Sequence, residues 1–400
     1  MTRTIFSGGM VFDGTGAPPS AAEVAIEAGR IVDVGSRLDG DVSVDVGGRT
    51  LLPGLFDCHT HVTISGVDLW RAAQQPFSYQ FYEAARNLES TLRIGITTIR
   101  DAGGADLGIK EAVDDGLVVG PRMQISIVML SQTGGHGDDW YPSGAEVPFL
   151  IAHPGRPSGL VDGPDQVRRK VRELVRAGAD VIKVATSGGV LSPRDDPRHA
   201  HFRPAELEAL VEEATAAGIF VMAHAQGADG IKNAVRAGIR SIDHGIYLDD
   251  EAIELMKERG TWFVPTLVAP QGVIDAAAAG VPLPPAVIDK AHRVVEIHRS
   301  AFRRAVDAEV RIAMGTDSGV TPHGRNLREL GLMVDGGMTP LAALEATTRS
   351  AAELLGVDGE LGTIETGKIA DLVVVSGGIG DVSTLGDRVD QVWKAGAQVV

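Results

Sequence analysis

The sequence of 400 residues is poor in aromatic side chains and has a single cysteine. Because Cys58 has no second cysteine to pair with, no disulfide can form within the chain, which is typical of a reducing compartment. No apolar run reaches the length of a transmembrane helix, and the N-terminus has no sustained apolar stretch of the signal-peptide kind. We therefore expect a cytoplasmic protein without a membrane partner.

The chain also has no excess of positive charge. Its 37 Lys and Arg residues stand against 53 Asp and Glu residues, which gives a formal net charge of −16. A nucleic-acid-binding surface needs basic patches, so we do not expect a nucleic-acid partner. Hydrophobic residues make up 44% of the chain, and a chain of this length can bury a large core. We expect a homo-oligomer that acts on a small-molecule substrate.

Short apolar runs alternate with longer amphipathic runs through the middle of the chain, which predicts an α/β fold. The predicted strands are Thr50–Phe56, Ile96–Arg100, Arg122–Val128, Asp180–Ala185, Phe220–Ala223, Ser241–Ile242, Thr261–Thr266 and Arg311–Met314. The clearest predicted helices are Pro164–Ala177, Pro204–Ala217, Asp249–Arg259 and Pro284–Ala305. Eight successive units of strand and helix predict a parallel (β/α)₈ TIM barrel, to which we assign residues 53–357.

The two ends of the chain have a different pattern. Short strands separated by Gly-rich turns are predicted at Val24–Ile26, Arg30–Val34, Ser43–Val46, Ala370–Val375 and Gln391–Val400. Neither end is long enough to form a stable sheet alone. We therefore predict one small, discontinuous β-sandwich domain built from residues 1–52 and 358–400.

Functional side chains of a barrel lie at the C-terminal ends of its strands. At or just after the ends of the predicted strands, or within one of them, the sequence has four histidines, one lysine and one aspartate: His59, His61, Lys183, His224, His244 and Asp317. These six side chains are therefore expected to converge on one rim. Taken singly, His224 and His244 would be ordinary barrel residues, but their positions at successive strand ends favour a metal site.

The spacing of the first two histidines suits two ligands on one ion. His59 and His61 flank a single residue, so in extended backbone both side chains point the same way. A second pair, His199 and His201, has the same spacing but lies in a loop rich in Pro and Asp with no apolar strand before it. We predict that this second pair lies on the surface.

Lys183 is the most informative of these residues. Lysine is almost never fully buried without a partner, and desolvation favours its neutral amine. A neutral amine can add CO₂ and release a proton, which gives a carbamate whose two oxygens can bridge two metal ions. The alternative is a lysine that reaches from the strand end to solvent. Asp317 can ligate a metal and accept a proton from water, or it can simply cap a helix.

In this order along the chain, the six residues resemble the ligand set of the amidohydrolase superfamily. The segments Leu52–Leu55, Gly95–Thr98, Arg100-Asp101, Gly362–Glu365 and Gly367–Leu372 are also similar to that family. The resemblance implies two divalent ions, with Zn²⁺ as the expected metal. It implies that His59, His61 and Asp317 hold the first ion, that His224 and His244 hold the second, and that carboxylated Lys183 bridges them. It also implies the split β-domain.

Two further segments, Gly134–Gly137 and Lys183–Gly189, resemble the branch of Xaa-Pro dipeptidases and N-acyl amino acid carboxypeptidases. This resemblance implies that His136 and Tyr247 contact the substrate and act in catalysis, although a loop histidine and a tyrosine packed at the rim are the alternatives. Asn326, in the loop after Asp317, is a third candidate for substrate binding, against the alternative of a solvated loop residue.

The leading hypothesis is hydrolysis of the amide bond of a dipeptide or N-acyl amino acid. A metal-bridging hydroxide would attack the carbonyl carbon, His136 or Tyr247 would help to polarise its oxygen, and Asp317 would shuttle the proton to the leaving amine. The alternatives are a hydrolase of a xenobiotic amide, carbamate, urea or cyclic imide-like ring, and a non-catalytic binding protein on the same fold.

Overall fold

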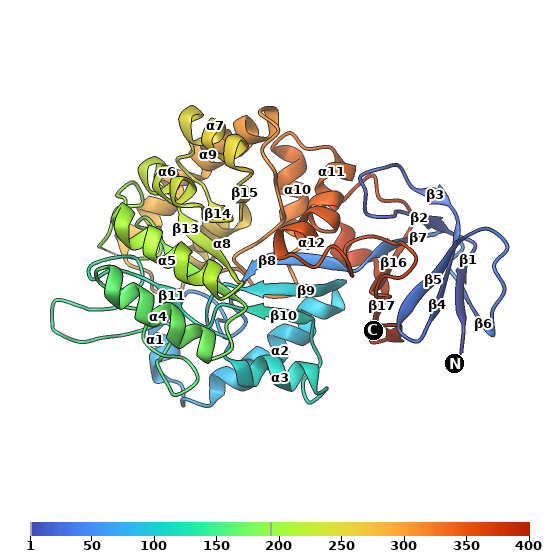
Figure 1. The fold of residues 1–400 in the computed structure, drawn as a ribbon, viewed down its shortest axis with the longest axis horizontal. Coiled ribbons are helices and arrows are strands. Elements are labelled where there is room, and N and C mark those ends of the chain that lie inside the picture. The colour runs from blue at the N-terminus through green and yellow to red at the C-terminus, as the bar shows by residue number, and fades with distance from the viewer. Residues whose placement is uncertain (1, 193) are drawn as a thin grey trace.

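A computed structural model describes residues 2–192 and 194–400, which have an α/β architecture with a larger and a smaller part (Figure 1). The strands of the larger part are β8 (Leu55–Thr60), β9 (Ile96–Asp101), β10 (Arg122–Ile125), β11 (Met129–Leu130), β12 (Val181–Ala185), β13 (Phe220–Ala225), β14 (Ser241–His244) and β15 (Trp262–Val264). They form a three-stranded sheet, β10-β9-β8, and a five-stranded sheet, β11-β12-β13-β14-β15, in which all neighbours are parallel.

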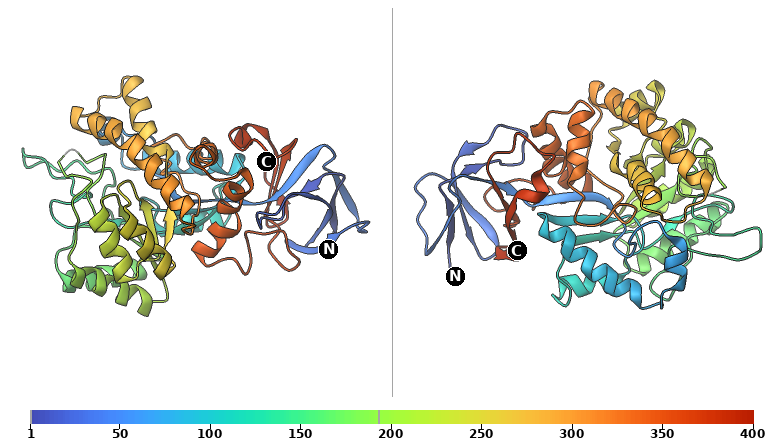
Figure 2. Two further views of the ribbon diagram at one scale, coloured as in Figure 1. Left: turned by 90° about the horizontal axis from the view of Figure 1, so that it is seen from above. Right: turned by 180° about the vertical axis from the view of Figure 1, so that it is seen from behind.

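The helices lie on the outside of these strands (Figures 1 and 2). They are α1 (Leu69–Gln74), α2 (Tyr79–Arg93), α3 (Leu107–Asp114), α4 (Pro164–Arg176), α5 (Pro204–Ala216), α6 (Ala228–Ala237), α7 (Asp250–Arg259), α8 (Val268–Ala278), α9 (Pro285–Asp307), α10 (Arg328–Asp335), α11 (Pro340–Ala346) and α12 (Arg349–Leu355). Helix α4 buries Val167, Val171 and Leu174, which lie on one face at helical spacing. Within the residues described, no helix has the combined length and apolarity that crossing a membrane requires.

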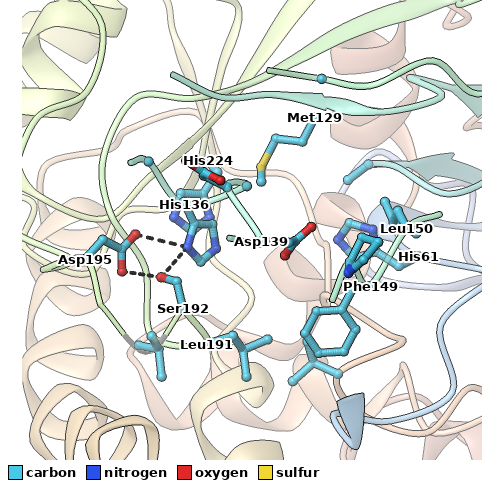
Figure 3. A pocket seen from close by; sticks show the side chains of 18 of the residues that line it. His61, Met129, His136, Asp139, Phe149, Leu150, Leu191, Ser192, Asp195 and His224 are labelled. Atoms are coloured by element: carbon cyan, nitrogen blue, oxygen red, sulfur yellow. Dashed lines mark hydrogen bonds and ion pairs between the residues drawn. The ribbon is translucent and has the colours of Figure 1, made fainter. Parts of the chain in front are cut away.

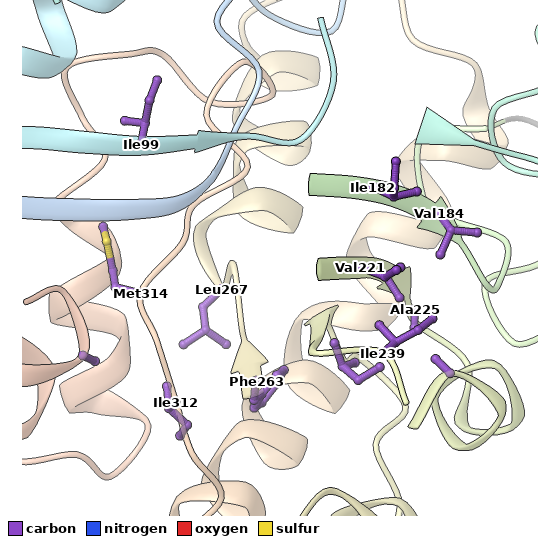
Figure 4. Close-up of a cluster of buried hydrophobic side chains, with 14 of the residues drawn as sticks. Ile99, Ile182, Val184, Val221, Ala225, Ile239, Phe263, Leu267, Ile312 and Met314 are labelled. Carbon is purple, nitrogen blue, oxygen red and sulfur yellow. The ribbon is translucent and has the colours of Figure 1, made fainter. Parts of the chain in front are cut away.

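Alternation along the strands separates the core from the site. In β12, Ile182 and Val184 belong to the hydrophobic cluster shared with the surrounding helices (Figure 4). Lys183 lies between them and therefore points to the opposite face, toward the interior of the ring of strands. In β14, Ile242 packs in the same cluster, which leaves Asp243 on the inner face.

The eighth predicted strand, Arg311–Met314, is wrong as a strand. Its Ile312 makes one isolated parallel bridge to Phe263 of β15, and Met314 O accepts a hydrogen bond from Cys58 N of β8 at 2.9 Å. The segment thus lies between β15 and β8, but the strands do not form one continuous closed sheet. At Gly315 the segment packs closely against its neighbours, since a Cβ there would lie only 2.4 Å from Val264 Cγ1.

Two other predicted strands are each divided in the structure. Thr50–Phe56 spans the end of β7 (Arg49–Pro53) and the start of β8, which belong to different sheets. Gly54 joins them, and a Cβ there would lie 2.1 Å from Thr97 Oγ1, so only glycine fits at this crossing. Arg122–Val128 is interrupted after β10, because Ile127 takes the left-handed conformation with φ 68°.

The smaller part is built from both chain ends, whose blue and red segments lie together at one side of the molecule (Figures 1 and 2). Its strands are β1 (Thr4–Ser7), β2 (Met10–Val11), β3 (Ser20–Ala21), β4 (Glu23–Glu27), β5 (Arg30–Gly35), β6 (Val42–Asp45), β7, β16 (Leu372–Ser376), β17 (Val389–Lys394) and β18 (Ala397–Gln398), with a short 3₁₀ helix at Leu385–Arg388. The predicted strand Gln391–Val400 is divided by a left-handed turn at Ala395 and Gly396.

Two sheets make up this part, ordered β5-β4-β1-β6 and β18-β17-β16-β7-β2-β3. They share a hydrophobic cluster, to which Phe6 and Ile26 come from the first sheet and Leu51 and Val374 from the second. The exact domain boundaries and the description as a β-sandwich stay predictions.

Candidate metal centre

Four histidines and one aspartate meet at the C-terminal ends of the parallel strands. His59 lies in β8, His224 in β13 and His244 at the end of β14. Asp317 Oδ1 lies 3.4 Å from His59 Nε2 and 3.2 Å from His61 Nε2. One ligand atom each from His59, His244 and Asp317 lie within 4.8 Å of one another, a spacing that suits a metal ion.

The imidazole rings form one connected group. The ring centroid of His59 lies 5.3 Å from that of His61 and 4.9 Å from that of His244. The ring centroids of His224 and His244 are 4.6 Å apart. The structure therefore brings together all four histidines that the strand-end pattern singled out. Their role as metal ligands stays a prediction.

Each ring is oriented by a hydrogen bond at one nitrogen, and the second nitrogens of His59 and His61 face Asp317 Oδ1. The contacts are His59 Nδ1 with Asp243 Oδ2 at 2.8 Å, His61 Nδ1 with Gly103 O at 2.7 Å, His244 Nδ1 with Thr266 Oγ1 at 2.7 Å, and His224 Nε2 with Gly188 O at 3.1 Å. Metal-ligating histidines almost always hold their second nitrogen in this way, to a carboxylate, a carbonyl or another acceptor. The donor set present thus fits a metal centre.

Burial keeps two of these rings neutral. Desolvation lowers the pKa of His224 and of His244 well below the usual value, and neighbouring positive groups lower it further. Burial would raise the pKa of the Asp317 carboxyl, but hydrogen bonds from His59 and His61 hold it well below its usual range. Neutral imidazole and ionised carboxylate are the forms that bind metal ions.

Lys183 and Asp243 form a buried pair beneath the histidines. Lys183 is only 1% exposed, and its Nζ lies 3.2 Å from Asp243 Oδ2. Arg100 Nη2 lies 3.4 Å from the other oxygen of Asp243. Burial lowers the pKa of Lys183, whereas Asp243, although also buried, has its pKa held well below the usual range by Lys183 and Arg100.

Asp243 is the main residue of the site that sequence reasoning missed. Alternation along a strand would send Asp243 and His244 to opposite faces. Both reach the site because His244 has the left-handed φ of 75°, and Thr266 and Asp317 beside it also have positive φ, of 54° and 60°. Such conformations cost about 1–3 kcal/mol each and concentrate at functional sites. The sequence signal that could have identified Asp243 is a charged residue inside the short strand β14.

A cavity of about 520 Å³ opens over the histidines and is lined by the long loop between β11 and α4 (Figure 3). His136 of this loop stacks on His224, with centroids 4.2 Å apart and planes 17° from parallel. Its Nδ1 lies 2.8 Å from Ser192 Oγ and 3.4 Å from Asp195 Oδ2. A Cβ on Gly189 would lie 2.1 Å from the His136 ring, so the ring packs directly on that backbone.

Buried Lys290 of α9 fixes the loop that holds His136. Its Nζ donates to Gly189 O at 2.9 Å, to Ser192 O at 2.7 Å and to Asp195 O at 2.6 Å. Lys290 also pairs with the Asp195 carboxylate at 3.3 Å. His136 is therefore a rigidly placed group at the edge of the metal centre.

The structure does not place the other two predicted substrate contacts in the cavity. Asn326 is fully buried, and its amide donates to Asp57 Oδ2 at 2.8 Å and accepts from Gly324 N at 3.0 Å, so its polar atoms are already used. Tyr247 packs against the apolar cluster beside α8 and α9, while its neighbour Ile246 lines the cavity instead.

The prediction that His199 and His201 lie on the surface is right for His199 and wrong for His201. His199 is exposed, but His201 is only 5% exposed, because its backbone N donates to Thr186 O at 2.8 Å and draws it against the end of β12. Neither residue lines the cavity. His298 of α9 is buried and also lines the cavity.

The chain is similar to several known hydrolases over almost its whole length. The chain is 36% identical to an ochratoxinase of Aspergillus niger, over 98% of this chain and 86% of that protein. A solved Xaa-Pro dipeptidase with bound methionine is 35% identical, with a TM-score of 0.90 and coverage of 99% of both chains. A prolidase complexed with N-methylphosphonate-L-proline is 37% identical, with a TM-score of 0.91 and coverage of 100% of this chain and 99% of that one.

The fold of these relatives implies a TIM barrel with a second domain, which is the arrangement expected from the sequence. The model of the amidohydrolase family matches residues 50–399, which include every residue of the candidate metal centre. The protein is a hydrolase, and the chain belongs to the amidohydrolase family.

Proposed function

We propose that this protein is a binuclear metal-dependent hydrolase that cleaves the amide bond of a dipeptide or an N-acyl amino acid. The observation that carries the proposal is the group of four oriented histidines with Asp317, which lies at the floor of a cavity of about 520 Å³. The solved relatives that bind methionine or a proline phosphonate support an amino-acid-like substrate.

The assignment of residues to the two metals follows the ligand pattern that the resemblance to the amidohydrolase family implies. His59 and His61, together with Asp317, would hold the first ion, and His224 and His244 the second, with carboxylated Lys183 between them. When bound, two zinc ions would lower the pKa of water to about 7 and polarise the carbonyl group.

The protein's own side chains would then position the substrate and transfer a proton to its leaving amine. Asp317 lies where it can take a proton from the attacking water and return it to the leaving amine. His136 donates from Nδ1 to Ser192 Oγ, and in its protonated form it would also donate from Nε2 to the carbonyl oxygen of the substrate. Apolar side chains of the lining, among them Val128, Leu150 and Ile246, limit the access of water.

A second candidate is hydrolysis of a bulkier xenobiotic amide, which the similarity to an ochratoxinase supports. Activity on N-acetyl-L-methionine and on its carboxamide separates the two, with released acetate as the measurement. For an amino-acid hydrolase we expect kcat/KM on the carboxamide to be lower by at least about tenfold, since groups that pair the carboxylate would be left unsatisfied. Equal rates on both compounds favour the second candidate.

Metal analysis tests the centre itself. Protein reconstituted with zinc is expected to hold about two equivalents per chain by elemental analysis, one for each ligand set. A reproducible single equivalent with full activity contradicts the bridging lysine. No metal and no turnover would leave a binding protein on the same fold.

Asp195→Asn tests whether His136 needs its support. We expect kcat to fall about 10–100-fold, the usual effect of removing an orienting carboxylate, with zinc content unchanged. Asp196→Asn is the matched control, because Asp196 is adjacent, carries the same charge and, among the residues that the structure describes, pairs its carboxylate only with Arg198. Equal losses of kcat in both variants, or loss of zinc in Asp195→Asn, contradict this role.

A further inference from the structure

Asp139 lies in the wall of the cavity with no partner for its carboxylate. It belongs to the loop between β11 and α4, and its carboxylate points into the cavity, in the view of Figure 3 between His136 and His61. Within residues 2–192 and 194–400, its side chain makes no hydrogen bond or ion pair with another side chain or with the backbone. Only its backbone O is engaged, by Val147 N at 3.2 Å.

The other charged groups of this part of the lining do not compensate it. The Asp138 carboxylate accepts hydrogen bonds from Gly134 N at 2.7 Å and from Trp140 N at 3.2 Å, and Glu146 adds a further negative charge. Outside the metal centre, Arg194 is the one lysine or arginine among the lining residues described. Arg194 is held elsewhere, because it lies over the Trp140 ring, 5.3 Å from the centroid, and donates to Trp140 O.

An unpaired carboxylate in such a place is unfavourable for the protein alone. Burial raises the pKa of Asp139 to about 7, His136 opposes this, and Asp138 and Glu146 add to it. A partly desolvated charge is stabilised when an opposite charge arrives beside it. The Asp139 carboxylate is therefore suited to bind a positively charged group of a ligand. It does not stabilise the folded protein.

We propose that Asp139 binds a positively charged group of the substrate, so that the site favours dipeptides or N-acyl amino acids that carry an ammonium or guanidinium group. This inference rests on the proposed amide hydrolysis and adds the charge of the substrate to it. The cation can come from two sources, the free α-amine of a dipeptide or a basic side chain. Both would make the same ion pair with the Asp139 carboxylate.

Four substrates distinguish these sources: Nα-acetyl-lysine, N-acetyl-norleucine, alanyl-lysine and alanyl-norleucine. Norleucine matches the carbon chain of lysine without the charge, and acetyl replaces alanyl without the α-amine. We expect zinc-loaded wild-type protein to prefer at least one cationic member over its neutral counterpart by about tenfold or more in kcat/KM. Asp139→Asn is expected to lose this preference and to retain its activity on N-acetyl-norleucine.

Glu146→Gln is the matched control, since it removes one negative charge from the same lining at an exposed position. Glu146→Gln should leave the preference for cationic substrates unchanged. An equal loss of this preference in both variants would mean that the total negative charge of the lining, and not an ion pair with Asp139, attracts the cation. A preference that survives in Asp139→Asn overturns the inference, and so does a loss of zinc from that variant, which would make Asp139 a metal ligand. If none of the four substrates is hydrolysed by wild-type protein holding two zinc ions, the proposed function fails instead.

A binding measurement keeps the inference testable without turnover. L-lysine at millimolar concentration should raise the melting temperature of the zinc-loaded protein more than L-norleucine does, and Asp139→Asn should remove the difference. The variant should melt no lower than wild type in the absence of ligand, because an unpaired carboxylate does not stabilise the fold. A lower melting temperature, or equal effects of the two amino acids on wild type, contradicts the proposal.

Discussion

Lys183→Ala is expected to be nearly inactive and to bind zinc at least about 100-fold more weakly than wild type. This loss exceeds the usual effect of changing a residue that only hydrogen-bonds to a metal ligand. Lys183 is buried beside Asp243 and is the one lysine among the described lining residues, so alanine removes the amine that a carbamate would use. In the metal-free protein, where the Lys183 amine is unmodified, the change also leaves Asp243 without one of its two cationic neighbours. Equilibrium dialysis against zinc, followed by a turnover assay, measures both losses.

The space left by the lysine side chain offers a direct check of the bridge. Propionate at millimolar concentration should enter it, present two oxygens to the metals and restore part of the activity. Propionamide is the control, because it has the same shape and no charge. Equal rescue by both compounds, or a Lys183→Ala protein with two zinc ions and full activity, rules out an anionic bridge at this position.

Asp243→Asn is expected to lower the free energy of unfolding by about 3–5 kcal/mol, as breaking a buried ion pair does. Arg100 and Lys183 would lose their common counter-charge, and His59 would lose the carboxylate that orients its ring. Because the folded-state pKa of Asp243 lies below its ordinary value, its stabilisation is present at neutral pH and is lost only as the pH falls through that depressed value. Urea unfolding of metal-free protein at neutral pH measures the effect.

Asp371→Asn is the matched control for this change. Asp371 is also buried and pairs with an arginine, since Arg122 Nη1 lies 2.7 Å from its Oδ2, but it belongs to the smaller part of the molecule. Both variants should lose stability, and only Asp243→Asn should also lose zinc affinity. Equal zinc binding by the two proteins would show that Asp243 stabilises the barrel without organising the metal centre.

The sequence predicts the parallel strands and the six strand-end residues well, because both depend on local patterns. Apolar runs of four to six residues mark β12 and β13, and the polar residues within or just after them, Lys183 and His224, point to the same rim by the geometry of a parallel sheet. The resemblance to the amidohydrolase family, which the family match confirms, adds the expected order of the ligands.

The remaining features depend on contacts between distant segments. His244 reaches the same site as its neighbour Asp243 because it takes a positive φ, which no pattern of residue types reports. Asn326 is drawn away from the cavity by Asp57, which precedes it by most of the chain. Asp139 lies in a long loop without periodicity, so its place beside the histidines depends on how that loop packs on the barrel.

The junction at Gly54 has a consequence for how the protein is made. Strand β7 runs directly into β8, which carries His59, yet its antiparallel partner β16 comes from the opposite end of the chain. During synthesis at about 5–20 residues per second, the apolar face of β7 therefore waits for roughly 15–60 s before that partner leaves the ribosome. Over this interval the nascent chain exposes an unpaired strand edge next to the segment that carries His59. Folding on the ribosome thus depends on protection of that edge, and recombinant yield should respond to a chaperone more than the stability of the finished enzyme does.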